Sequence, residues 1–177
     1  LAACAQIDAI KAMLEIFPWA ETDGAHLGIK MEDAESHALT CTPDLYHVDP
    51  CYVEVKFDSR TPVMATKENC QDAAEKTAHA HGFEFETPGM IPPHRVAADS
   101  AFVQKLLHAY EHVTGLKGEA MAIGGGTYVH EIKNGVAFGA VLPGIDTHMH
   151  GADEFFDLEN IVLATKVYAE AIIELCS

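Results

Sequence analysis

Residues 136–154 read Val-Ala-Phe-Gly-Ala-Val-Leu-Pro-Gly-Ile-Asp-Thr-His-Met-His-Gly-Ala-Asp-Glu. The run from Val136 to Leu142 has no polar alternation, which predicts a strand covered on both faces in an α/β layer. The loop after it carries His148 and His150, and α/β enzymes place ligands on such loops. On an extended chain the two side chains point the same way. A neutral imidazole is a good zinc ligand, but a catalytic zinc takes about three protein ligands, so partners must lie elsewhere.

The composition limits the classes of partner. The chain has 177 residues, 49% of them apolar, which allows one large or two small domains with a real core. It has 11 basic and 27 acidic residues and a formal net charge of −16. This balance argues against nucleic acid and anionic membranes as partners and suits a protein that handles small molecules. No apolar run reaches membrane-span length, and no signal peptide is visible.

The cysteines indicate a reducing compartment. Their number is odd and no Cys-x-x-Cys pair occurs, so we expect free thiols in a cytoplasmic protein. The residues are Cys4, Cys41, Cys51, Cys70 and Cys176. The chain begins with leucine rather than methionine, so we expect a processed or truncated product.

The first half predicts a small α+β sandwich. Apolar residues at helical spacing predict a first helix that ends at Pro18. Strict alternation over 51–58 predicts a half-buried antiparallel strand. Thr66 is a plausible N-cap for a helix that runs to about His81 and stops at Gly82. Shorter strands are expected over 38–41 and 83–86.

Two prolines in Met90–His94 predict a stiff linker, and we place the domain boundary there, between residues 1–92 and 93–177. After it, Asp99 is expected to cap a helix that stops at Gly115. A short strand is expected over 120–123, followed by a sharp glycine turn. A final helix begins near Leu158, with an expected apolar stripe of Ile161, Ala164, Tyr168, Ile172 and Leu175.

Two features favour binding of a carboxylate. The turn Gly124-Gly125-Gly126-Thr127 follows a predicted strand, and successive free backbone N–H groups in such a turn can hold an anion. A tight turn that needs positive φ is the plainer interpretation. Arg60 ends the alternating strand, and its guanidinium suits bidentate capture of a carboxylate. An ordinary surface arginine is the alternative.

The other histidines are weaker candidates. His47-Val48-Asp49 has the form of a metal-ligand pair but lies in a predicted hairpin connection, so we interpret it as a decoy. His79 and His81 lie at the polar end of a helix. The remaining ones show no ligand-like grouping: His26, His37, His94, His108 and His112.

Four segments in this order resemble the peptidase V-type dipeptidases, which are dinuclear zinc exopeptidases related to carnosinase and aminoacylase. They are Asp58-Ser59-Arg60, Gly124-Gly125-Gly126-Thr127-Tyr128, Gly135-Val136-Ala137-Phe138-Gly139 and His150-Gly151-Ala152-Asp153-Glu154. The resemblance implies that residues 1–92 are part of a lid or dimerisation domain. Residues 93–177 would then be the C-terminal part of an α/β catalytic domain.

The resemblance also assigns roles to single residues. It implies that His150 is a zinc ligand, that Arg60 binds the C-terminal carboxylate of a dipeptide, and that Gly125, Gly126 and Thr127 line the same pocket. A complete enzyme of this type holds two zinc ions, which polarise the scissile carbonyl and activate a water. His130 stands where many relatives have arginine.

The general base and the other zinc ligands of such enzymes have no match in this chain. The chain thus resembles a C-terminal fragment that lacks an N-terminal catalytic half, and alone it is expected to be inactive. Oligomers are possible. Two alternatives remain: an amidohydrolase of the same superfamily that acts on acylated or succinylated amino acids, and a non-catalytic binding or dimerisation module.

Overall fold

The chain forms two structural units. A computed structural model describes residues 2–139 and 141–177. The first unit consists of Leu1–His94 together with Ala122–Gly125, and the second of Arg95–Met121 together with Gly126–Ser177. No helix in the described ranges has the length and apolarity needed to cross a membrane.

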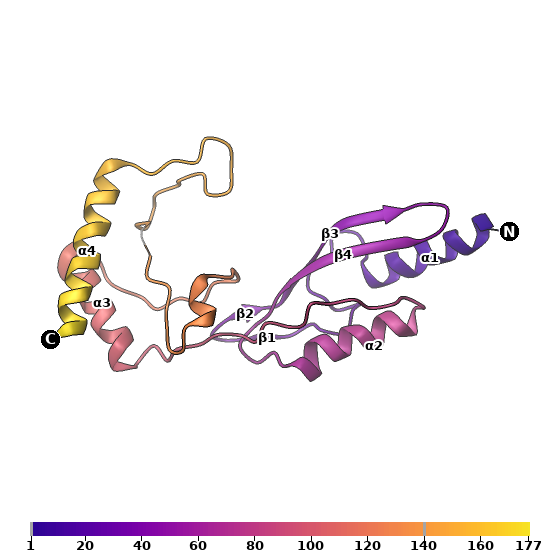
Figure 1. Ribbon diagram of the computed structural model, residues 1–177, viewed down its shortest axis with the longest axis horizontal. Helices are drawn as coiled ribbons and strands as arrows, with labels where there is room; N and C mark the ends of the chain where they lie inside the picture. Colours follow the sequence, from indigo (N-terminus) through magenta and orange to yellow (C-terminus); the bar gives the residue numbers. More distant parts are fainter. Residues whose placement is uncertain (1, 140) are drawn as a thin grey trace. The chain divides into compact units, whose positions relative to one another are not determined.

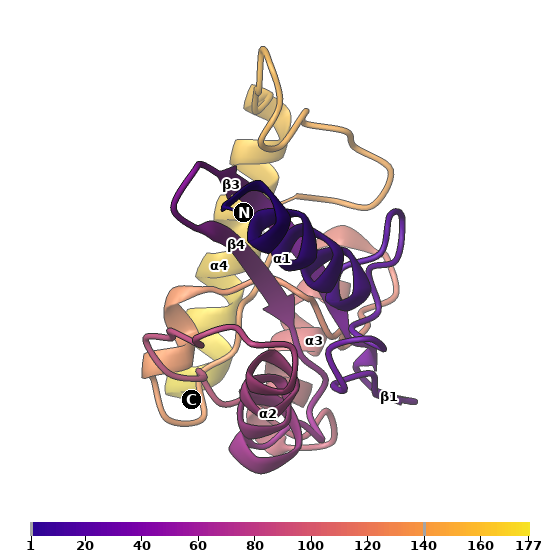
Figure 2. The ribbon, with the colours of Figure 1, turned by 90° about the vertical axis from the view of Figure 1, so that its right-hand side faces the viewer.

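The first unit combines helices with two small antiparallel sheets. Its elements are α1 (Ala2–Ile16), β1 (Glu32–Asp33), β2 (His37–Ala38), β3 (Thr40–Val48), β4 (Val53–Arg60), a π-helical turn η1 (Lys67–Gln71) and α2 (Asp72–Ala80). β1 pairs with β2, and β3 with β4. Helix α1 runs alongside the β3–β4 hairpin (Figures 1 and 2). The predicted first helix, the alternating strand and the helix after Thr66 are confirmed.

The core of this unit is closed by its own residues. Leu27, Ile29 and Leu39 are each 1% exposed, because they belong to one buried cluster with residues of the β3–β4 hairpin and α2. Phe57 contributes from β4 and stacks in a tilted arrangement against Phe17, with ring centroids 5.2 Å apart. This is the half-buried face that the alternation of β4 predicts.

The helix after Thr66 begins and ends as the sequence indicates. The Thr66 hydroxyl accepts a hydrogen bond from the Asn69 N–H, and Gly82 adopts a left-handed φ of +82°. The predicted strand over 83–86 is wrong. These residues make no ladder with any strand in the described part of the chain, and Phe85 instead packs against Phe57.

The second unit is built on a pair of packed helices, α3 (Ala101–Thr114) and α4 (Leu158–Cys176). Its small core is formed by Leu106, Ala109 and Ala171. Both predicted helices are confirmed. The N-cap of α3 is Ser100 rather than Asp99: its hydroxyl accepts from the Val103 N–H, and the helix stops at Gly115 with φ +69°.

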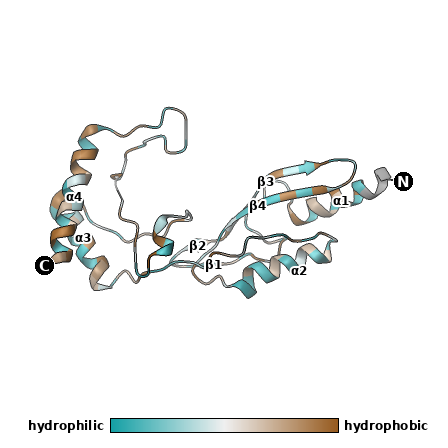
Figure 3. Ribbon diagram, in the orientation of Figure 1, coloured by the Kyte–Doolittle hydropathy of each residue, from teal (hydrophilic) through white to brown (hydrophobic). Residues whose placement is uncertain are grey.

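The packed face of α4 differs from the predicted stripe. The buried residues are Asn160, Ala164, Val167 and Ala171. Most of the larger aliphatic residues point outward, with Ile161 45% and Ile172 63% exposed. Small side chains at the helix contact allow α3 and α4 to approach closely, which explains the shift. Hydrophobic residues consequently surround much of α4 (Figure 3).

The predicted buried strand over 136–142 is also wrong, although Ala140 lies outside the described residues. Val136 and Phe138 pack against the α3–α4 pair, while Ala137 and Gly139 are exposed. The Tyr168 hydroxyl donates to the main-chain oxygen of Phe138 at 2.9 Å. A strand needs a neighbour, and no described segment supplies one here. The same reason accounts for 120–123, which forms no strand.

Candidate substrate and metal-binding site

Arg60 occupies the last position of β4. It pairs in register with Thr40 of β3, so its backbone is fixed by the hairpin. Its Nη2 atom lies 2.6 Å from Oδ2 of Asp58, two residues earlier on the same strand face. Both side chains are about half exposed, at 50% and 46%. The guanidinium is therefore held at the strand end and remains open to solvent.

The glycine turn reaches Arg60. Residues Ala122–Gly125 belong to the same unit as β4. A Cβ placed on Gly124 would lie 3.6 Å from Cβ and 3.9 Å from Cγ of Arg60, so the backbone of Gly124 passes along the arginine stem. A Cβ on Gly125 or Gly126 would meet no atom within 4 Å. Two segments about 60 residues apart in sequence are thus brought together.

Thr127 caps a short 3-10 helix, η2 (Tyr128–Glu131), in the second unit. The Nδ1 atom of His130 lies 3.3 Å from the backbone nitrogen of Thr127 and 3.0 Å from its carbonyl oxygen. His130, whose role the sequence left open, therefore folds back onto Thr127 and fixes the exit of the glycine turn.

The loop that carries His150 is closed on itself. Gly151 donates to the His148 carbonyl at 2.7 Å, and Phe155 donates to Thr147 at 3.1 Å. His148 and His150 both have positive φ, at 54° and 63°. The expectation of an extended segment with parallel histidines is wrong, because a turn of this type needs left-handed residues.

The two histidines have different surroundings. The ring of His148 meets Phe155 edge to face, with centroids 5.6 Å apart. His150 is exposed, and its backbone N–H donates a hydrogen bond to Oε2 of Glu154 at 3.3 Å. Among the described residues, no three His, Cys, Asp or Glu side chains are grouped so that they could hold a metal. The donors present here do not fit a catalytic metal by themselves, because His150 supplies a single ligand.

His47-Val48-Asp49 closes the β3–β4 connection. The Asp49 carboxylate accepts hydrogen bonds from the N–H groups of Cys51 and Tyr52, at 2.6 and 3.0 Å. These bonds lower the pKa of Asp49 below its ordinary value. His47 stacks on Tyr52, with centroids 4.9 Å apart. Both side chains therefore make contacts within the β3–β4 connection.

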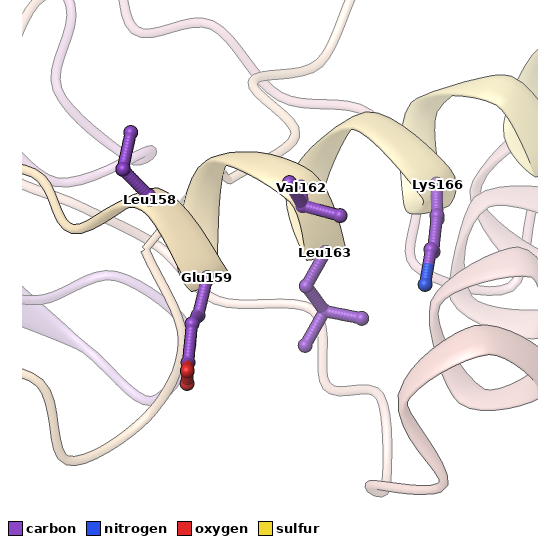
Figure 4. Close-up of a pocket in the computed structure, with 5 residues that line it drawn as sticks. All are labelled: Leu158, Glu159, Val162, Leu163 and Lys166. Atoms are coloured by element: carbon purple, nitrogen blue, oxygen red, sulfur yellow. The ribbon is translucent and has the colours of Figure 1, made fainter.

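A shallow pocket opens on α4 and contains none of the predicted site residues. Leu158, Val162 and Leu163 line it together with Glu159 and Lys166 (Figure 4). All five come from the outward, mostly apolar side of one helix. The pocket offers no group of convergent polar side chains for a small substrate.

Comparison with known proteins identifies the family. Residues 3–174 match the peptidase family M20/M25/M40, and the chain belongs to this family. Peptidases of this family are generally metal-dependent. The predicted resemblance to dipeptidase-like metallopeptidases is confirmed at the level of the family.

The relatives are named as dipeptidases. The chain is 35% identical to "Putative dipeptidase YtjP" of Bacillus subtilis over 156 residues, which are 88% of this chain and 33% of the relative. It is 41% identical to "Putative dipeptidase SH1171" of Staphylococcus haemolyticus over 101 residues, which are 57% of this chain and 22% of that protein. The chain thus spans about a third or less of the length of these relatives.

Proposed function

We propose that this chain is the C-terminal part of a zinc-dependent, cytoplasmic dipeptidase that hydrolyses the peptide bond of dipeptides. The family match and the names of the relatives support the reaction class. Residues 1–92 would form part of the lid, and residues 93–177 the end of the catalytic domain. The observation that carries the proposal is the approach of Gly124 to Arg60.

Arg60 and the glycine turn would bind the C-terminal carboxylate of the substrate. Arg60 brings a charge-assisted, fork-shaped donor to the end of β4. Gly125 and Gly126 leave open space around the turn, so a carboxylate can approach the backbone closely. Capture of a terminal carboxylate sets the distance to the scissile bond and selects short substrates.

His150 would supply one zinc ligand. Its exposed position on a closed loop allows it to face another part of a larger protein. The general base and the remaining ligands would lie in the portion of the relatives' length that this chain does not span. The 177-residue chain alone should therefore not hydrolyse a dipeptide such as Leu-Gly, even with added zinc.

The experiment introduces His150→Ala, His148→Ala and Arg60→Ala one at a time into an enzyme that contains this chain and has the full length of its relatives. His150→Ala should remove most activity and weaken metal retention, while His148→Ala should do much less. Arg60→Ala should retain metal and lose about 1.5–3 kcal/mol of substrate binding. Elemental analysis beside dipeptidase rates separates these effects.

A dipeptide amide sharpens the assignment of Arg60. This substrate lacks the terminal carboxylate, so Arg60→Ala should slow its hydrolysis far less than that of the free dipeptide. Arg60→Lys, which keeps the charge but not the fork, is the matched control. Equal losses on both substrates, or metal loss in His148→Ala but not in His150→Ala, would overturn the corresponding role.

A further inference from the structure

Two histidines of α3 face two glutamates of α4 within the second unit. Nδ1 of His108 lies 2.6 Å from Oε1 of Glu174, and Nδ1 of His112 lies 2.8 Å from Oε1 of Glu170. The earlier histidine pairs with the later glutamate, so the helices are antiparallel. Lys105 adds a bond from Nζ to the main-chain oxygen of Glu174 at 2.5 Å. Each histidine thus has one glutamate as its partner across the contact between the two helices.

The glutamates determine which ring nitrogen is protonated. An ionised carboxylate only accepts hydrogen bonds, so Nδ1 of each histidine must carry a hydrogen. In the neutral ring this leaves a lone pair on Nε2. Glu174 and Glu170 are 24% and 25% exposed, whereas His108 and His112 are 65% and 66% exposed. Both rings therefore keep a basic nitrogen on solvent-exposed side chains.

The spacing places the rings next to each other. Residues four apart lie on one face of a helix, and the rings of His108 and His112 have centroids 6.2 Å apart and planes within 13° of parallel. Rotation about the side-chain bonds can tilt the two Nε2 atoms toward one cation, which zinc would bind at about 2.0–2.1 Å.

We propose that His108 and His112 form a surface site for a divalent transition-metal cation. Their Nε2 atoms would be the two protein ligands, and water would complete the coordination. Glu174 and Glu170 would accept the Nδ1 hydrogens, an arrangement that orients histidine ligands and raises their basicity. Imidazole ligands favour copper, nickel and zinc over magnesium and calcium.

This site is separate from the His150 loop and does not depend on peptidase activity. The four-residue spacing of His108 and His112 carries no metal-ligand signature in the sequence, and the contact between α3 and α4 is what brings the two glutamates to them. With two protein ligands, the site should bind metal more weakly than a catalytic centre that has three.

The test is a calorimetric titration of the 177-residue chain with Ni²⁺ under reducing conditions. The variant with both His108→Gln and His112→Gln should bind one Ni²⁺ fewer than the unsubstituted chain. Each single variant should weaken that site at least about tenfold, and Glu174→Gln should weaken it roughly 10- to 100-fold. Glutamine retains an N–H that can donate to the glutamates, which protects the helix pair. Circular dichroism checks the helical content.

The matched control replaces His26 and His47, which are about half exposed and lie in the first unit, by glutamine. It should leave this site intact. Paramagnetic broadening by Ni²⁺ in the unsubstituted chain gives a second readout, and it should include the ring protons of both His108 and His112. An unchanged number of sites in the double variant, or absence of broadening at these rings, would overturn the proposal.

Discussion

The two units differ in how far each completes its own core. In the first, Leu27, Ile29 and Leu39 are shielded by helices and a paired hairpin. In the second, a helix pair buries small side chains, while Tyr128 is 96% and Met121 80% exposed. Regular structure forms where a segment finds a partner, and apolar segments without one remain irregular.

The proposed functional residues show the same contrast. Arg60 is fixed by a hydrogen-bonded strand, and Gly124 lies against its stem. His150 lies on an exposed loop in which Asp153 also has positive φ, at 56°. The backbone of the proposed carboxylate-binding residue is thus fixed by a strand, whereas the proposed metal ligand lacks companion ligands among the described residues.

The largest expected difference is in the rate at which buried and exposed cysteines react with a thiol reagent. Burial raises the pKa of Cys41 to about 12, and the neighbouring Cys70 adds to the effect. The exposed thiols of Cys51 and Cys176 should react with a thiol reagent at pH 8 far faster than Cys41, which is buried and has a very small thiolate fraction. Mass spectrometry of the modified peptides measures the rates.

The raised pKa of Cys41 also makes the stability of the first unit depend on pH. Because the folded pKa of Cys41 is raised, its contribution to stability is full below the ordinary thiol pKa and is lost as pH rises toward about 12. The first unit should therefore unfold more readily under alkaline conditions. Rapid labelling of Cys41 at neutral pH would contradict the closed core.

Truncation of a single side chain should have the second-largest effect, and its cost in free energy of unfolding should differ between the two units. Leu39→Ala should destabilise the first unit by about 2–5 kcal/mol, because it leaves a cavity among fully buried neighbours. Tyr128→Ala in the second unit should change stability by no more than about 0.5 kcal/mol, because the side chain is exposed. Urea unfolding monitored in both variants gives the values. A comparable loss for Tyr128→Ala would show that η2 is buried in solution.

Substitution of two glycines with similar backbone conformation should give a smaller difference in the free energy of unfolding than core truncation does. Gly24 and Gly144 both have left-handed φ, at +69° and +83°, which costs another residue about 1–2 kcal/mol. A Cβ on Gly24 would also lie 2.7 Å from Cγ1 of Ile29, whereas a Cβ on Gly144 would meet nothing within 4 Å. Gly24→Ala should therefore lower the free energy of unfolding by about 1–3 kcal/mol more than Gly144→Ala does, as measured by thermal or urea unfolding. Equal costs would mean that the loop around Gly24 relaxes freely.

Removal of a helix cap should have the smallest effect on the free energy of unfolding, and the effect should be similar in both units. Thr66→Ala removes the acceptor for the Asn69 N–H, and Ser100→Ala removes the acceptor for the Val103 N–H. Each should cost about 1 kcal/mol, because a cap acts locally. Circular dichroism during urea unfolding measures both. A cost well above this for Ser100 alone would indicate that the helix pair depends strongly on its first turn.

The sequence by itself determined the elements whose signals are local. The alternation of β4, the cap at Thr66 and the left-handed stops at Gly82 and Gly115 all appear in the structure. The four family segments likewise indicate the dipeptidase-like metallopeptidase family. Periodicity, capping and turn chemistry act within a few residues, so a single sequence is enough to reveal them.

Tertiary structure decided what depends on distant partners. The run 136–142 has the composition of a buried strand but lacks a neighbouring strand among the described residues, so it packs against helices. The packed face of α4 follows the small residues Ala164 and Ala171 rather than the large aliphatic ones. The approach of Gly124 to Arg60 and the pairing of His108 with Glu174 join segments more than 60 residues apart. Such contacts depend on packing and hydrogen bonds formed only after the chain folds, which no local pattern encodes.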